Sequence, residues 1–122
     1  MFLIDPLSRV PVYLQIIEAF KNEVITGEIE ADGQIPSVRE LSMLLNTNPN
    51  TIQKAYGELD RQGLIYSAPG KGSFLSADAK DRILRERKDE EMKKILDAVG
   101  RLSGIGISKE EIIEEIKRGE KI

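Results

Sequence analysis

The sequence contains no cysteine, no histidine and no tryptophan among its 122 residues. Without cysteine, the chain can form neither a disulfide nor a thiolate metal site. Without histidine, it also lacks the side chain that most often performs acid–base catalysis and binds metals near neutral pH. A metal would need carboxylate ligands alone, and the sequence has no glycine-rich nucleotide loop and no spacing typical of catalytic residues. We therefore expect a protein that is not an enzyme and that has no cofactor and no metal site.

Long apolar runs are missing as well. No stretch approaches the roughly 18 apolar residues that a membrane-spanning helix requires, and the N-terminus does not have the layout of a signal peptide. These features predict a cytoplasmic protein with no membrane partner. The length fits one ordinary domain with a small appendage, and a hydrophobic content of 40% is sufficient for a core.

Residues 35–75 carry the strongest local signals. Ser37 is followed three residues later by Glu40, which is the spacing of a capping box and predicts the start of a helix. The apolar face of this helix would consist of Leu41, Leu44 and Leu45. Asn46 and Thr47 then interrupt the pattern. Because asparagine tolerates the left-handed backbone conformation, they predict a tight turn.

A second helix is predicted directly after this turn. Asn48 can cap it, Pro49 can occupy its first position, where a missing N–H has no cost, and Gly63 is a natural stop. Its core-facing residues, at helical spacing, would be Ile52, Ala55, Tyr56 and Leu59. Another helix is expected upstream, between Pro11 and Gly27. Its apolar stripe would comprise Tyr13, Ile16, Ile17, Phe20 and Val24.

A small hairpin is predicted after the second helix. The strand-prone runs at residues 64–66 and 73–75 enclose a turn-forming cluster at residues 68–72. Lys71 lies between two glycines, which would let the backbone approach a narrow surface, and Ile35 could add a short strand beside the hairpin. Helix, turn, helix and a glycine-rich β-loop with a lysine predict a winged helix-turn-helix, in which the second helix enters the major groove of DNA.

This pattern closely resembles the N-terminal domain of GntR-family transcription regulators. The resemblance is carried by residues 11–16, 36–41, 48–59, 63–65 and 69–74, which read PVYLQI, PSVREL, NPNTIQKAYGEL, GLI and PGKGSF. Asn46-Thr47 departs from the family's frequent Gly-Val. The short C-terminal part resembles the YtrA-type subgroup. The resemblance implies a homodimeric DNA-binding regulator, with a repressor as the better expectation, and short-tailed members often control transporter genes, frequently in their own operon.

The predicted DNA contacts fall at the two helix starts and at the wing. Ser37 can be a plain cap, or can also hold a phosphate with the N–H groups of its helix. Arg39 can bind guanine or phosphate unless it pairs with a neighbouring acid. Asparagine and glutamine can pair with adenine, and Tyr56 combines a ring for the core with a hydroxyl that could reach phosphate. The full predicted set is Ser37, Arg39, Asn48, Asn50, Thr51, Gln53, Lys54, Tyr56, Gly70, Lys71 and Gly72.

The C-terminal part predicts a dimerisation hairpin. A long charged helix is expected from Asp78 to Gly100, then a break at residues 103–106, and then a last helix opened by the capping pair Ser108 and Glu111. Such a hairpin is too small to bury its own apolar face. A second copy would cover that face, unless the hairpin folds back on its own winged domain. The predicted dimerisation residues are Met92, Ile95, Leu96, Val99, Leu102, Ile112, Ile113 and Ile116.

The predicted fold is therefore mainly α with a small β-hairpin. A winged helix-turn-helix DNA-binding domain would occupy residues 1–76, and a two-helix dimerisation tail would occupy residues 77–122. The net charge of −3 is unfavourable for DNA binding, but Arg39, Lys54 and Lys71 fall in the two helices and the wing that would face DNA. We expect a modest basic face and weak non-specific binding.

The predicted partners are double-stranded DNA with an inverted-repeat operator, a second copy of the chain and an unknown small-molecule effector. An effector could lodge between subunits, because a dimer interface can enclose a pocket. The alternative function is a winged helix that binds a protein partner without specific DNA binding.

Overall fold

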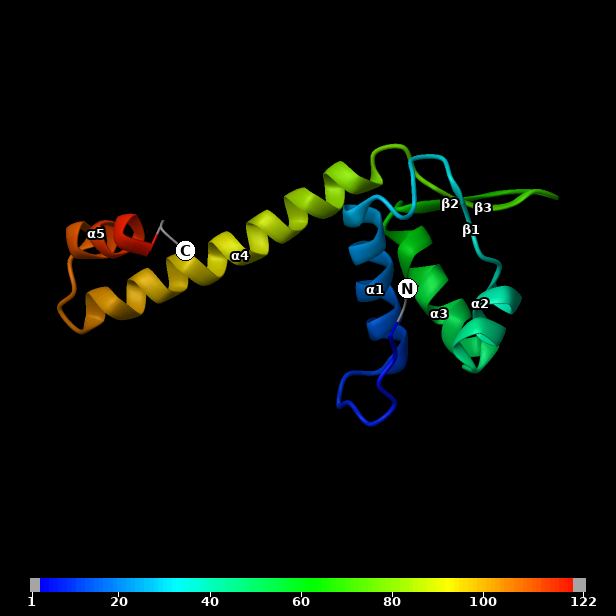
Figure 1. The fold of residues 1–122 in the computed structure, drawn as a ribbon, viewed down its shortest axis with the longest axis horizontal. Coiled ribbons are helices and arrows are strands. Elements are labelled where there is room, and N and C mark those ends of the chain that lie inside the picture. Colours follow the sequence, from blue (N-terminus) through cyan, green and yellow to red (C-terminus); the bar gives the residue numbers. More distant parts are fainter. Residues whose placement is uncertain (1–2, 120–122) are drawn as a thin grey trace. The chain divides into compact units, whose positions relative to one another are not determined.

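The computed structural model describes residues 3–119 (Figure 1). In chain order, its elements are α1 (Val12–Thr26), β1 (Gln34–Ile35), α2 (Val38–Leu45), α3 (Pro49–Arg61), β2 (Ile65–Ala68), β3 (Gly72–Leu75), α4 (Ala79–Gly104) and α5 (Lys109–Gly119). The chain forms two compact units with a boundary between Leu84 and Arg85. In the described part of the chain, these are residues 3–84, the winged unit, and residues 85–119, the tail unit. The predicted mainly α fold is confirmed.

The helix α1 begins and ends where the local chemistry predicts. Pro11 precedes its first residue, and Gly27 follows its last residue in the left-handed conformation, with its N–H directed at the carbonyls of Glu23 and Val24. One side of α1 packs on α3, and α3 also contacts α2 and β2. The helix α3 is therefore the central element of the winged unit.

The core of the winged unit is contiguous and apolar. Its buried residues are Ile16, Ile17, Phe20, Val24, Ile35, Leu41, Ile52, Ala55, Tyr56, Leu59, Leu64, Ile65, Leu75, Ala79 and Ile83. The last two belong to the first two turns of α4, and each is 0% exposed. The start of α4 is therefore part of the winged unit's own core.

The three strands form an antiparallel sheet in the order β1-β3-β2. Gln34 is paired with Phe74, and on the other side of β3 Tyr66 is also paired with Phe74. The short strand expected at Ile35 is thus present. The rings of Tyr66 and Phe74 stack with 5.7 Å between their centroids. In Figure 1, β2 and β3 form a ribbon that extends beyond the helices of the winged unit.

The predicted apolar face of α2 is partly wrong. Leu41 is buried, but the Leu44 side chain is 60% exposed. The stripe that meets the core is instead formed by Val38, Leu41 and Leu45, which pack on or within the core cluster. In a helix these three residues span one narrow side, whereas Leu44 lies on the other flank of Leu41.

The tail unit contains the rest of α4 and all of α5. The helix α4 continues to Gly104, beyond the predicted end at Gly100, and the chain reverses over residues 105–108 (Figure 1). The Ser108 hydroxyl accepts a hydrogen bond of 3.1 Å from the Glu111 N–H, as the capping pair predicts. No residue from 85 to 119 is buried. No helix in residues 3–119 combines the length and apolar character needed to cross a membrane.

Candidate nucleic-acid interface

The start of α2 is organised by the predicted capping box. The Ser37 hydroxyl accepts a hydrogen bond of 3.0 Å from the Glu40 N–H, and the Glu40 carboxylate accepts one of 3.2 Å from the Ser37 N–H. The N–H groups of Val38 and Arg39 have no acceptor within the described residues. They are the free donors of a helix start, where partial positive charge favours an anion such as a phosphate.

The turn between α2 and α3 closes although it lacks the usual Gly-Val. Asn46 takes the left-handed conformation with φ 49°, as its residue type predicts. The Thr47 N–H donates to the Ser42 carbonyl over 3.0 Å, and the Thr47 hydroxyl donates to the Leu45 carbonyl over 3.1 Å. The Ser42 hydroxyl in turn donates to the Thr47 carbonyl. These side-chain bonds fix the angle at which α3 leaves α2.

The first two turns of α3 present polar side chains away from the core. Asn48 caps the helix, because its side-chain oxygen accepts a hydrogen bond of 2.9 Å from the Asn50 N–H. The buried side of α3 consists of Ile52, Ala55, Tyr56 and Leu59. Asn50, Gln53 and Lys54 are exposed, and Thr51 is half-buried. This is the arrangement in which a helix can offer amides to base edges.

Lys54 is held in place by the first helix. Its ammonium nitrogen lies 4.1 Å from the centroid of the Tyr13 ring, which makes a cation–π contact between α3 and α1. Such a contact contributes about 0.5–1 kcal/mol at an exposed site. The Tyr13 ring packs against the core, as its place in the apolar stripe predicts, but it is only half-buried and also contacts a predicted DNA-binding lysine.

Tyr56 connects α3 to the segment before α2. Its side chain is 8% exposed, and its hydroxyl donates a hydrogen bond of 2.7 Å to the Pro36 carbonyl. Burial raises the pKa of Tyr56 well above its ordinary value, and the carboxylates of Glu40 and Glu23 raise it further. The Tyr56 hydroxyl therefore stays protonated and donates its single proton to the Pro36 carbonyl. In this geometry Tyr56 links α3 to the segment before α2 and supports the exposed side chains that are predicted to contact DNA.

The wing tip depends on a residue that the sequence did not single out. The Gln34 side-chain amide donates a hydrogen bond of 2.9 Å to the Lys71 carbonyl. Gly72 has φ 119°, and a Cβ atom there would lie 2.7 Å from the Gln34 amide nitrogen. Gln34 could be found from the sequence only by pairing β1 with β3. It fixes the backbone of the tip, while the Lys71 side chain is exposed.

A second link holds the base of the wing. The Tyr66 hydroxyl donates a hydrogen bond of 2.9 Å to the Asp32 carboxylate, and this bond raises the pKa of Tyr66. Asp32 is in the loop that precedes β1 and has a positive φ of 59°. The loop and the strand before the helix-turn-helix thus hold the wing at both its base and its tip.

The predicted cations and amides remain separate from one another. The side chains of Arg39 and Lys71 are exposed and have no hydrogen-bond or ion-pair partner within residues 3–119, so the Arg39 guanidinium does not pair with its neighbour Glu40. Within this range, the only side-chain hydrogen bond that joins two of the predicted DNA-binding residues is the one from the Asn50 N–H to the Asn48 side chain. The exposed side chains are therefore available to an external ligand rather than engaged in an internal network.

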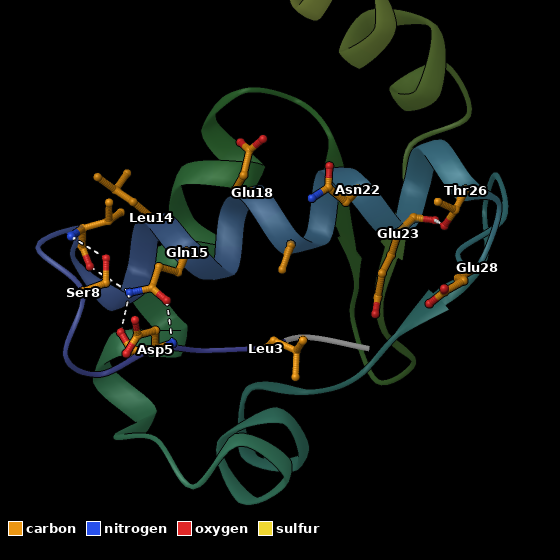
Figure 2. Close-up of a pocket in the computed structure, with 12 residues that line it drawn as sticks. Leu3, Asp5, Ser8, Leu14, Gln15, Glu18, Asn22, Glu23, Thr26 and Glu28 are labelled. Atoms are coloured by element: carbon orange, nitrogen blue, oxygen red, sulfur yellow. Dashed lines mark hydrogen bonds between the residues drawn. The ribbon is translucent and has the colours of Figure 1, made fainter. Parts of the chain in front are cut away.

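The outer face of α1 bears a groove of a different character (Figure 2). It has a volume of about 550 Å³ and lies between α1 and the N-terminal segment, residues 3–10. Gln15 holds this segment, because its amide donates to the carbonyls of Asp5 and Val10 over 2.9 and 2.8 Å. The charged side chains that line the groove are Asp5, Glu18, Glu23 and Glu28. Carboxylates repel phosphate, so these side chains do not favour contact with a DNA backbone.

The predicted dimerisation residues are all in the tail unit and all accessible. Met92, Ile95, Leu96, Ile113 and Ile116 are exposed, with Leu96 at 62%, and Val99, Leu102 and Ile112 are half-buried. The helices α4 and α5 make little contact with each other. The tail unit therefore has an apolar surface that its own residues do not cover.

Comparison with known proteins identifies the family. Residues 12–75 match the model for bacterial regulatory proteins of the gntR family. The chain is 35% identical to the HTH-type transcriptional repressor YtrA of Bacillus subtilis, over 99% of this chain and 98% of that protein. A transcriptional regulator from Oenococcus oeni has a similar structure, with a TM-score of 0.81 and 31% identity over 97% of this chain and 98% of that one.

A structure solved with DNA is also similar. The DNA-binding domain of AraR in complex with operator ORX1 matches with a TM-score of 0.55 and 37% identity, over 61% of this chain and 92% of that chain. These relatives are transcriptional regulators and not enzymes. The chain belongs to the GntR family of bacterial transcriptional regulators.

Proposed function

We propose that this protein is a sequence-specific DNA-binding repressor that binds an inverted-repeat operator as a homodimer. The observation that carries the proposal is the arrangement of the first two turns of α3. It combines a capped helix start with exposed Asn50, Gln53 and Lys54 on the side opposite the buried core residues. In helix-turn-helix proteins, this part of the second helix contacts base edges in the major groove.

The proposed contacts divide into reading and positioning roles. Asn50 and Gln53 read base edges, since amides pair two-pronged with adenine, and Thr51 meets a thymine methyl group or a phosphate. Asn48 stays at the cap and orients the others. Ser37, with the free N–H groups of Val38 and Arg39, holds a phosphate.

The cations supply the remaining affinity. Arg39 binds guanine or straddles a phosphate with its guanidinium fork. Lys54 leaves or shares its contact with Tyr13 to meet the DNA backbone, and the Gly70-Lys71-Gly72 tip inserts toward the minor groove. Few cations and a net charge of −3 imply a weak non-specific component, so base contacts and pairing of two copies must provide most of the selectivity.

The proposed dimer uses the tail unit. Its exposed apolar side chains lie on α4 and α5, and a second copy would cover them symmetrically. Two recognition helices joined in this way would contact half-sites about 34–36 Å apart, which is one turn of DNA. By similarity to the short-tailed regulators of the family, we propose that the operator lies upstream of the protein's own operon and that this operon includes transporter genes.

A footprint on the DNA upstream of the gene tests the proposal. Purified full-length protein should protect one inverted repeat, and a gel shift with that repeat should weaken steeply with salt and disappear when the half-sites are scrambled. Equal binding to every duplex, or to none, would contradict the proposal. In that case, capture of a protein partner through the same helix would support the interaction module instead.

A further inference from the structure

The first two turns of α4 contact the C-terminal end of α3, the proposed recognition helix. The Arg82 guanidinium donates one hydrogen bond of 3.0 Å to the Gly63 carbonyl and a second one to the Gln62 carbonyl. Both carbonyls come directly after α3, which ends at Arg61. Ala79 and Ile83, on the same turns of α4, are each 0% exposed. Arg82 is therefore bound to a fixed part of the winged unit's core.

The chemistry of this contact is that of a helix cap supplied by another helix. Gln62 is the C-cap residue of α3 and Gly63 follows it, so both carbonyls lie at the C-terminal end of the helix, where partial negative charge favours a cation. A guanidinium has several donors in a rigid plane and can bind two neighbouring oxygens at once. Lys or Gln at position 82 could not reproduce that two-oxygen geometry.

Several short contacts converge at the same place. Gly63 has φ +75°, and a Cβ atom there would lie 2.9 Å from the Arg82 Nη1 atom. The Leu64 carbonyl, one residue further, accepts a hydrogen bond of 2.9 Å from the Ser76 N–H. The end of α3, the start of β2 and the start of α4 thus meet around one cation.

We propose that Arg82 is a positioning residue for DNA recognition, and that the DNA-binding domain extends through Leu84. Arg82 fixes the C-terminal end of α3 against the base of α4, and so sets the direction in which the first turn of α3 meets the major groove. This inference rests on the proposed DNA-binding function. It adds a residue that does not itself contact DNA.

Matched substitutions in the full-length protein test the proposal. Arg82→Gln and Arg82→Lys should both weaken operator binding by about 2- to 30-fold, with an unchanged salt dependence, because no phosphate contact is lost. Arg85→Gln removes the same charge three residues further along α4, from an exposed side chain, and should leave the affinity unchanged. If Arg82→Lys restores wild-type binding, or if Arg82→Gln lowers the salt slope by about 1, Arg82 contacts DNA directly and the proposal is wrong.

Substitutions at two glycines distinguish loss of the contact between Arg82 and the end of α3 from general destabilisation of the protein. Gly63→Ala places a Cβ against Arg82, whereas Gly27→Ala places one at a similar φ of +85° with no atom within 4 Å. Gly63→Ala should weaken operator binding more than Gly27→Ala does, and its extra effect should vanish in the Arg82→Gln background. Equal effects of the two glycine substitutions on operator binding would overturn the proposal.

A measurement without DNA distinguishes failure of this inference from failure of the proposed function. Amide hydrogen exchange in the last turn of α3 should be faster in Arg82→Gln than in the wild type or in Arg85→Gln. Unchanged exchange of these amides would show that Arg82 does not fix the end of α3, whether or not the protein binds DNA. If the wild type binds no operator, the proposed function fails, and faster exchange would then leave Arg82 with a structural role only, which also refutes the positioning role.

Discussion

The winged unit and the tail unit use their apolar residues in opposite ways. Residues 3–84 bury a contiguous core around α3, and even the start of α4 contributes to it. Residues 85–119 bury nothing, although α4 and α5 carry isoleucine, leucine and methionine at helical spacing. One unit completes its own core, whereas the other has apolar side chains that are not covered within residues 85–119. In the proposed dimer, the stability of the tail unit would depend on protein concentration, and that of the winged unit would not.

The largest expected effect comes from placing a charge on the tail's apolar surface. Ile95→Asp should make the protein monomeric, because the Ile95 side chain is 52% exposed on α4 and a charge there would be buried in the proposed dimer. Operator affinity should fall by roughly 10²- to 10⁴-fold, since the two recognition helices would no longer be joined. Sedimentation and a gel shift measure both quantities.

The control for this charge is Lys93→Asp, an exposed position on the same helix that should change neither property. A monomeric Ile95→Asp protein that binds the operator as tightly as the wild type would show that the tail unit does not join the recognition helices.

A pair of truncations to alanine compares the two units directly. Leu59→Ala should lower the free energy of unfolding by about 2–5 kcal/mol at every protein concentration, because Leu59 is 0% exposed within the winged unit. The cost of Ile95→Ala should instead depend on protein concentration, since it weakens association. Thermal and denaturant unfolding over a hundredfold range of protein concentration would check this, and a concentration-independent effect of Ile95→Ala would contradict it.

Within the winged unit, substitutions of predicted base-reading residues and of predicted phosphate-contacting residues should change operator binding in different ways. Gln53→Ala should cost about 1–3 kcal/mol of operator affinity and relax the preference at one base pair, whereas Lys71→Ala should weaken binding to all sequences alike and reduce the salt slope by about 1. Binding to a set of single-base operator variants at several salt concentrations measures both. Asp60→Ala, exposed in the second half of α3, is the control, and a loss in Asp60→Ala equal to that in Gln53→Ala would reject the assignment.

The smallest expected effect concerns acid stability. Hydrogen bonds from Arg61 and Gln62 lower the pKa of Glu58 from 4.5 to about 2. The folded state therefore binds this proton less readily than the unfolded state, so the stabilisation is present above the ordinary pKa and is lost as the pH falls toward 2. The unfolding temperature of the wild type should exceed that of Glu58→Gln at pH 6, and the difference should shrink between pH 5 and pH 2. A constant difference would show that Glu58 acts through something other than its charge.

Features fixed by neighbouring residues could be predicted from the sequence. The Ser37–Glu40 box, the left-handed Asn46 and the end of α1 at Gly27 each depend on one or two local residues, and each occurs as expected. The helix-turn-helix and the family also follow from such local signals. The roles of the individual DNA-binding and dimerisation residues stay predictions.

Features that depend on distant parts of the chain could not be predicted. Gln34 and Lys71 are 37 residues apart, and Arg82 meets Gly63 across 19 residues. Neither contact leaves a periodic pattern in the sequence. The exposure of Leu44 likewise depends on which flank of α2 faces the core, and apolar spacing alone does not distinguish the two flanks.

The hydrogen bond between Gln34 and the wing tip means that residues upstream of the helix-turn-helix set the position of the wing. The residues that aim the hairpin precede the helix-turn-helix in the chain, and Asp32 and Gln34 contact neither α2 nor α3 through their side-chain hydrogen bonds. A change in length or sequence just before β1 would thus redirect the hairpin that we propose enters the minor groove, while leaving α3, the proposed major-groove helix, as it is. In the proposed complex, binding affinity and base preference would therefore be altered by separate mutations, one set upstream of the helix-turn-helix and the other within it.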